Sequence, residues 1–151
     1  MSNILPAITL YQPWATWIMR GWKTIETRTH NRFSCLNDKI ILIHAGLKTD
    51  ADARNNPYLT QKQLLYNPDE MVNGYILGSV HVNKIMSLND DHSEAALINC
   101  HTEYSCRFGL FLDSVKKFDT PIPVKGEMGI WYFDMDKKHK VKKTTTQTTI
   151  F

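Results

Sequence analysis

The stretch QPWATWIMRGWKTIETR, residues 12–28, carries the strongest structural signals in the chain. Pro13 suits the first turn of a helix, with Gln12 at the capping position before it. Gly21 suits the position just past the end of a helix, where a left-handed backbone is common. The spacing therefore predicts a short helix that begins at Pro13 and stops at Gly21.

The side chains of this helix predict which way it faces. Trp14, Trp17 and Ile18 stand at i, i+3 and i+4, so they share one face. We expect Trp17 to pack inward, as aromatic residues at helical spacing usually do. Trp14 opens the helix, where its indole either seals the core or stacks on a nucleic-acid base.

A polar strand is predicted directly after the helix, in the segment KTIETRTH at residues 23–30. Alternation places Glu26 and Arg28 on one face, about 7 Å apart along the strand. They can form a structural ion pair, and Arg28 can also offer a fork of donors to a phosphate or carboxylate. Lys23 stands at the turn, where it can pair with a phosphate or, if desolvated, act as a base.

Further strands are predicted on both sides of this segment, at residues 7–11, 39–46, 74–88, 107–120 and 121–135. The run KIILIHAG is nearly continuous aliphatic, so we expect it to be buried on both faces. His44 within it is more typical of a satisfied core histidine than of a catalyst.

Broken helical pieces are predicted at residues 48–66 and 90–101. Five to seven strands without regular strand–helix alternation indicate an α+β fold. The predicted architecture is a small, mixed, mostly antiparallel β-barrel with short helices inserted between its strands.

Length and composition predict one domain followed by a tail. The chain has 151 residues, of which 42% are hydrophobic and 22% charged, as in an ordinary soluble domain. We assign residues 1–136 to this domain, and residues 137–151, rich in lysine and then threonine, to a basic flexible tail. Because we recognise no signal peptide and no apolar run that spans a bilayer, we expect a cytoplasmic protein without a membrane partner.

The net charge of +3 hides an internal asymmetry. Residues 1–48 carry six basic and two acidic side chains, whereas residues 49–136 carry seven basic and thirteen acidic ones. Positive charge is thus concentrated around the opening stretch, where it can attract a phosphate ligand. The simpler alternative is that these charges are only solvated surface groups.

Three cysteines, Cys35, Cys100 and Cys106, form no disulfide framework and indicate reduced thiols. The segment CHTEYSC places His101 between two of them. A structural zinc site normally needs four ligands, and only three are offered here. We therefore predict neither a metal nor a cofactor.

Five blocks in this sequence closely resemble the ASCH domain, the activating signal cointegrator homology domain. They are QPWA, GWKTIETR, IHAG, GYILGSVHV and PVKGEMGIW, and they follow in family order across residues 7–133. The resemblance implies a PUA-like β-barrel, related to RNA-binding PUA domains, with a cleft beside the first helix. In the family that cleft is proposed to hold RNA or a nucleotide-like ligand. The residues expected to line it here are Trp14, Lys23, Glu26, Arg28, His44 and Lys125.

A hydrolase is one alternative function. One branch similar to this family removes acyl groups from N4-acylated cytidine nucleosides with a lysine, a threonine nucleophile and a glutamate. Lys23 matches that lysine, but Glu26 stands at the position of the threonine. Thr24 faces the same side as Glu26 but is displaced by two residues. A carboxylate cannot replace a hydroxyl in an acyl transfer that runs through an ester.

An enzyme of this kind would therefore be a metal-independent hydrolase of a modified nucleoside or of RNA, with Lys23 and Glu26 as catalytic residues that activate water. The second alternative is an adaptor module that binds protein partners in the regulation of transcription or translation. ASCH domains occur within transcription coactivators, which motivates this alternative.

Overall fold

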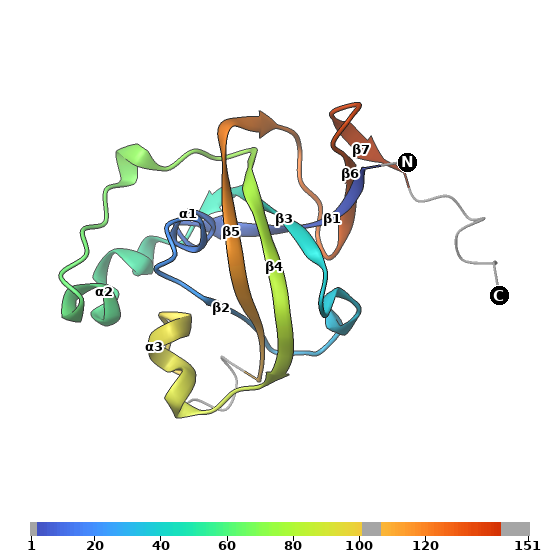
Figure 1. Ribbon diagram of the computed structural model, residues 1–151. Helices are drawn as coiled ribbons and strands as arrows, with labels where there is room; N and C mark the ends of the chain where they lie inside the picture. Colours follow the sequence, from blue (N-terminus) through green and yellow to red (C-terminus); the bar gives the residue numbers. More distant parts are fainter. Residues whose placement is uncertain (1–2, 101–106, 143–151) are drawn as a thin grey trace.

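The computed structural model describes residues 3–100 and 107–142, and it places seven strands in one sheet (Figure 1). The strands are β1 (Ile4–Gln12), β2 (Ile25–Arg28), β3 (Ile40–Thr49), β4 (Tyr75–Ser87), β5 (Phe108–Pro123), β6 (Trp131–Asp134) and β7 (His139–Val141). Their order is β2-β5-β4-β3-β1-β6-β7. Only β1 and β3 pair in parallel, and all other neighbours are antiparallel.

The predicted α+β class and the predominance of antiparallel pairing are confirmed, but a closed barrel is not. β2 pairs only with β5, and β7 pairs only with β6, so the sheet is open over the described residues. β2 has four residues and β7 has three, which offer few backbone groups for closing a barrel. The long strands β4 and β5 run side by side through the centre of Figure 1.

Three short helices, α1 (Trp14–Met19), α2 (Pro57–Gln61) and α3 (Ser93–Ala96), stand between the strands. The turn after α1 lies at the predicted glycine, because Gly21 has a left-handed backbone with a φ of +76°. The helix begins one residue later than expected, because Pro13 rather than Gln12 is the N-cap residue of α1. The buried side chain of Gln12 stabilises the first turn of α1, because its Oε1 accepts a hydrogen bond from the Thr16 N–H at 3.1 Å.

The core lies between the sheet and α1. Residues 41–46 of β3 are all buried, which confirms the expectation that this strand is covered on both faces. Trp17 is fully buried, as predicted, in a second cluster that joins α1 to Ala53, Leu59 and Leu97. α1 therefore packs against the sheet on one side and against the helical segments around Ala53, Leu59 and Leu97 on the other (Figure 1).

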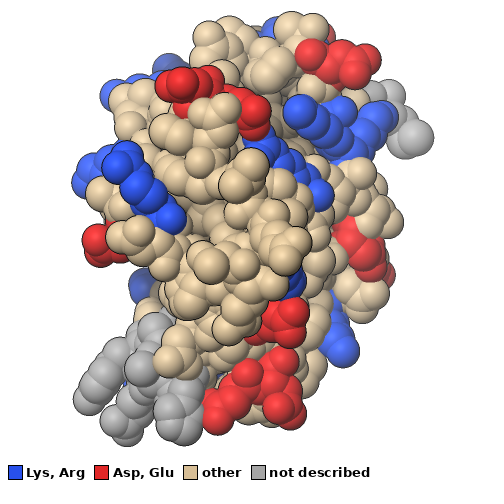
Figure 2. Space-filling view, turned by 90° about the vertical axis from the view of Figure 1, so that its left-hand side faces the viewer, with Lys and Arg blue, Asp and Glu red and all other residues tan. Residues whose placement is uncertain are grey.

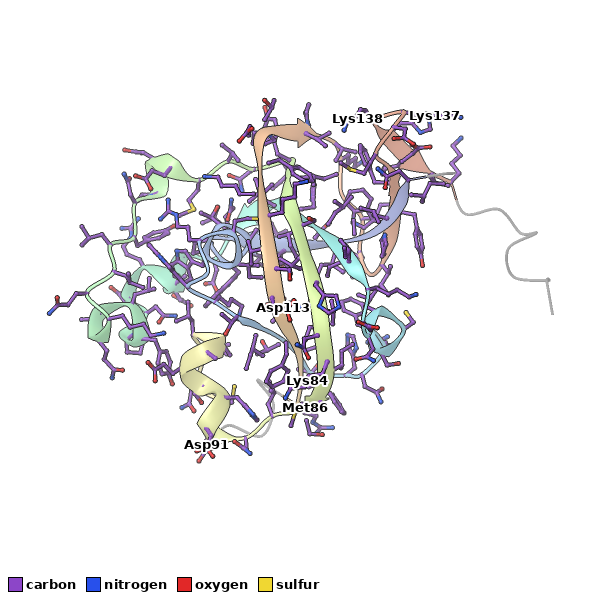
Figure 3. The ribbon with its side chains drawn as sticks, in the orientation of Figure 1. Lys84, Met86, Asp91, Asp113, Lys137 and Lys138 are labelled. Atoms are coloured by element: carbon purple, nitrogen blue, oxygen red, sulfur yellow. The ribbon has the colours of Figure 1, made fainter. Side chains whose placement is uncertain are left out.

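The segment predicted to begin the tail instead starts with an ordered strand. His139 to Val141 pair with Tyr132 to Asp134, so a boundary at residue 136 falls inside the β6–β7 hairpin. Figure 3 labels Lys137 and Lys138 at this hairpin, and Lys138 has a φ of +59°. Residues 143–151 of the predicted tail, and residues 101–106 of the cysteine-containing segment, lie outside the described residues.

One group of acidic side chains lies at the lower end of the face shown in Figure 2, at the level of α3 in Figure 1, and other acidic side chains lie near the top and the sides of that face. Asp91, labelled in Figure 3, precedes α3 there.

Among the described residues, none of the helices is both long and apolar enough to span a membrane.

One charged cluster joins β4 and β5 to the corner before β3. His81 Nδ1 lies 2.9 Å from Asp113 Oδ1, and Nε2 lies 2.8 Å from Asp38 Oδ1. Figure 3 labels Asp113 on β5. The hydrogen bond to Asp38, and to a smaller extent the one to Asp113, raises the pKa of His81 above its ordinary value of 6.5.

Because the folded state raises this pKa, the cluster stabilises the fold fully below about pH 6.5 and loses that contribution as pH rises through the raised pKa. We expect the urea midpoint of the unchanged protein to exceed that of His81→Gln at about pH 5.5 and to converge on it by about pH 8. Equilibrium urea unfolding at several pH values checks this. Parallel pH profiles for the two proteins would contradict it.

Candidate functional site

A cleft of about 1570 Å³ opens between β2 and the C-terminal halves of β1 and β3. Residues 124–130, which connect β5 to β6, form part of its wall. All six residues predicted for the site line this one cleft: Trp14, Lys23, Glu26, Arg28, His44 and Lys125. They come from four separate parts of the chain, and the fold brings them together. Their role in binding a ligand stays a prediction.

A buried group of charges forms the floor of the cleft on the β2 side. Lys23 is 2% exposed and Glu26 is 5% exposed, with Lys23 Nζ 3.7 Å from Glu26 Oε1. The other carboxylate oxygen, Oε2, accepts from Nη1 of Arg28, which also donates to the Thr27 carbonyl at 2.9 Å. Each oxygen of Glu26 thus faces a cation, which compensates for the cost of burying its charge.

Lys23 also links this floor to the helices. Its ammonium donates to the carbonyl of Ala96 in α3 and lies 5.0 Å from the ring centre of Trp14. The edge-to-face contact between Trp14 and Trp17 has a centroid distance of 5.1 Å, and the Trp14 indole donates to Asp50 at 3.2 Å. Trp14 is therefore held on several sides at the edge of the cleft.

Positive charge is concentrated at the other end of β2. The Arg28 guanidinium lies 5.0 Å from the ring centre of Phe33, and Arg32 is exposed nearby on the same cleft. Partial desolvation, then the charges of Arg32 and Arg28, lower the pKa of His30. His30 is therefore mostly neutral near pH 7.

The opposite wall contains a neutral hydrogen-bonded network around His44. Its Nε2 lies 2.7 Å from the Val124 carbonyl, and its Nδ1 lies 3.2 Å from the Thr9 hydroxyl. Because the carbonyl only accepts, neutral His44 carries its proton on Nε2 and accepts from Thr9. The same hydroxyl oxygen accepts from the Trp131 indole at 3.0 Å. Burial lowers the pKa of His44, so its ring is neutral and fully engaged.

The backbone at Gly126 packs closely against the side chains of Thr9 and His44 in this network. A Cβ at this position would stand 2.4 Å from Thr9 Oγ1 and 2.6 Å from two atoms of the His44 ring. Real Cβ atoms do not approach so closely, so only glycine lets the connecting segment lie here. The PVKG segment is thus explained by packing at Gly126, with Lys125 exposed beside it on the cleft.

Sequence reasoning missed several residues of the cleft, among them Thr9, Tyr11, Arg32, Lys48 and Met128. The basic residues in this set were signalled only by the excess of positive charge in residues 1–48. Five basic and three acidic side chains line the cleft, a net charge of +2 with histidines neutral. One of the acids, Glu127, is paired with Lys140 at 3.1 Å.

The position of Thr24 differs from the expectation. Thr24, the residue before β2, is exposed and does not line the cleft as Glu26 does, whereas Thr27 of β2 lines it. Within the part of the chain that the structure describes, no group of three or more His, Cys, Asp or Glu side chains has an arrangement that could hold a metal ion.

The open seven-stranded sheet and the charged cleft beside it define this chain as a small α+β domain. The ASCH domain model matches residues 8–122, and the chain therefore belongs to the ASCH domain family. No curated protein sequence matches it.

The fold is also that of solved ASCH structures. ASCH from Zymomonas mobilis is similar with a TM-score of 0.56 and 14% identity, over 88% of this chain and 91% of that one. A tyrosine-to-phenylalanine variant of the Z. mobilis protein gives a TM-score of 0.52 and 14% identity, over 96% and 95% of the two chains. At this identity the likeness shows the fold.

The buried charges should be energetically coupled. We expect Lys23→Met and Glu26→Gln each to lower the free energy of unfolding by about 3 kcal/mol, because each removes one charge from a buried group whose charges compensate each other. The double variant should cost less than the sum by about 0.5–3 kcal/mol. Urea unfolding of the four proteins measures this, and strict additivity would contradict the coupling.

The close packing at Gly126 predicts an intolerant position. Gly126→Ala should lower the free energy of unfolding by about 1–3 kcal/mol, because the Thr9 and His44 side chains must move. Met128→Ala, two residues along the same segment and almost fully exposed, is the matched control and should change stability by no more than about 0.5 kcal/mol. Equal stability of both variants would show that the segment moves away without cost.

Proposed function

We propose that the cleft binds RNA or a nucleotide-like ligand through its phosphate groups. The observation that carries this proposal is the excess of basic side chains along one open cleft, where the acidic Glu26 is already paired within the floor. Arginine and lysine at such a position attract phosphate over a distance and then form charge-assisted hydrogen bonds with it. Membership of the ASCH family, which is linked to RNA binding, supports the same proposal.

The buried floor of the cleft and its exposed rim, which is formed by Arg32, Lys48 and Lys125, have different roles in this proposal. Lys23 and Glu26 are buried and engaged with each other, so they brace β2 and hold Arg28 toward the cleft. Arg32, Lys48 and Lys125 are exposed and line the same cleft, which leaves their charged groups accessible to a ligand. Phosphate binding is therefore assigned to Arg28 together with the rim cations.

Hydrolysis by Lys23 and Glu26 has less support. Lys23 donates to the Ala96 carbonyl and is nearly fully buried, which restricts its approach to a substrate. Both oxygens of Glu26 face cations, so a water molecule would compete with Lys23 and Arg28 for them. The same two residues are fully accounted for as a structural brace.

RNA binding tests the proposal through its salt dependence. A short single-stranded RNA should bind at low salt and lose affinity as salt rises from about 50 to 200 mM. Arg32→Ala and Lys125→Ala should each weaken binding and reduce the slope of log affinity against log salt by about 0.7. Fluorescence anisotropy with labelled RNA measures both quantities.

Lys116→Ala provides the control for general charge. Lys116 is exposed on β5 and does not line the cleft, so its removal should leave the slope close to that of the unchanged protein. Equal effects of the three variants would indicate diffuse attraction rather than a site. No binding at low salt would exclude the proposal, and protein partners retained by all the cleft variants would favour an adaptor instead.

A further inference from the structure

Three large apolar side chains are exposed on the cleft. Tyr11 is 51% exposed at the end of β1, Leu47 is 80% exposed near the end of β3, and Met128 is 98% exposed in the connection to β6. Leu47 and Met128 are among the three most exposed large hydrophobic residues in the described part of the chain. They line the same cleft as the basic residues, which separates them from scattered surface hydrophobics.

Tyr11 is positioned by the alternation of β1. Ile8 and Leu10 belong to the main core cluster, whereas Thr9 and Tyr11 alternate with them and line the cleft. Lys48, from the neighbouring β3, places its ammonium 5.9 Å from the Tyr11 ring centre. Single-stranded nucleic-acid sites combine exposed aromatic rings, on which bases stack, with cations that follow the backbone, and Tyr11 is half exposed on a cleft lined by basic residues.

The other aromatic rings of the cleft are less accessible. Trp14 has Lys23 near one face and Trp17 at 5.1 Å, and its indole nitrogen is engaged with Asp50. Phe33 is buried and lies near Arg28. Tyr11 is the cleft aromatic with half of its surface open, and Met128 offers an adaptable thioether on the same cleft.

We infer that an unpaired base of single-stranded RNA stacks on Tyr11, with Met128 and Leu47 as apolar neighbours, while the strand's phosphates contact the basic rim. This inference rests on the proposed function and extends it from phosphate binding to the class of RNA. Bases within a duplex are stacked on each other and offer no free face, so the site requires an unpaired one.

The size of the cleft favours a strand over a single nucleotide. Small-molecule sites commonly measure about 300–1,000 Å³. The cleft here measures about 1570 Å³, and it is lined by basic residues as well as by the exposed side chains of Tyr11, Leu47 and Met128. A mononucleotide fills only part of that space, whereas a strand reaches both groups.

The test compares Tyr11 variants by anisotropy with a short labelled single-stranded RNA at low salt. Tyr11→Ala should weaken binding between about 5-fold and 150-fold, the usual loss for one base–aromatic stack. Tyr11→Phe keeps the ring and should bind nearly as the unchanged protein does. Tyr132→Ala is the matched control, because Tyr132 is 37% exposed on β6 and does not line the cleft.

Met128→Ala supplies a second, independent variant. Its side chain is almost fully exposed, so the substitution leaves the fold intact while it removes an apolar neighbour of the base. It should weaken single-strand binding, though less than Tyr11→Ala. A blunt duplex of the same sequence and adenosine monophosphate should both bind more weakly than the single strand. The Tyr11→Ala loss should be absent for the duplex.

The outcomes separate this inference from the proposed function. If Arg32→Ala and Lys125→Ala weaken binding but Tyr11→Ala and Met128→Ala do not, the stacking site is wrong and phosphate binding stands. Equal affinity for duplex and single strand also overturns the inference. Affinity for adenosine monophosphate equal to that for the strand assigns the site to a free nucleotide instead. If the unchanged protein binds no RNA at low salt, both the stacking site and the proposed phosphate binding are wrong.

Discussion

The paired carboxylate of Glu26 is the interaction on which the cleft depends. It lies between Lys23 and Arg28, two cations that would otherwise repel each other, and it is almost completely buried. A buried charge without a partner carries a large desolvation cost, so these three side chains constrain each other's positions. Because Lys23 also donates to Ala96, the same group of charges ties the turn after α1 to α3.

The two walls of the cleft are built on different principles. The β2 wall holds compensated charge, whereas the opposite wall holds a neutral network in which Thr9 connects His44 to Trp131. Burial keeps His44 neutral, so its ring adds no positive charge to that of Lys23 and Arg28. Gly126 packs against this network without a side chain, which brings the connecting segment and the exposed Lys125 to the cleft. Charge accessible to a ligand is therefore confined to the rim and to Arg28.

Much of the local structure could be predicted because its signals are short in range. Gly21 marks the end of α1, the aliphatic run of β3 marks a strand buried on both faces, and helical spacing marks Trp17 as core. The order of five motifs pointed to six candidate residues, and all six line one cleft, while their role in binding stays a prediction. A closed barrel is not confirmed, and the strand at residues 139–141 was not predicted, since both depend on which short strands pair.

By itself the sequence determined the helix and strand around residues 12–28, the charges they carry and the family to which the chain belongs. The helix and the strand follow from spacing along the chain, which acts over a few residues, and the family follows from the resemblance of five motifs and the match to the family model. Only the tertiary structure decided that Lys23 is a buried brace and that Tyr11 is open on the cleft. Burial and partners depend on α3, β3 and the connection to β6, which lie far away in sequence and meet these residues only after folding.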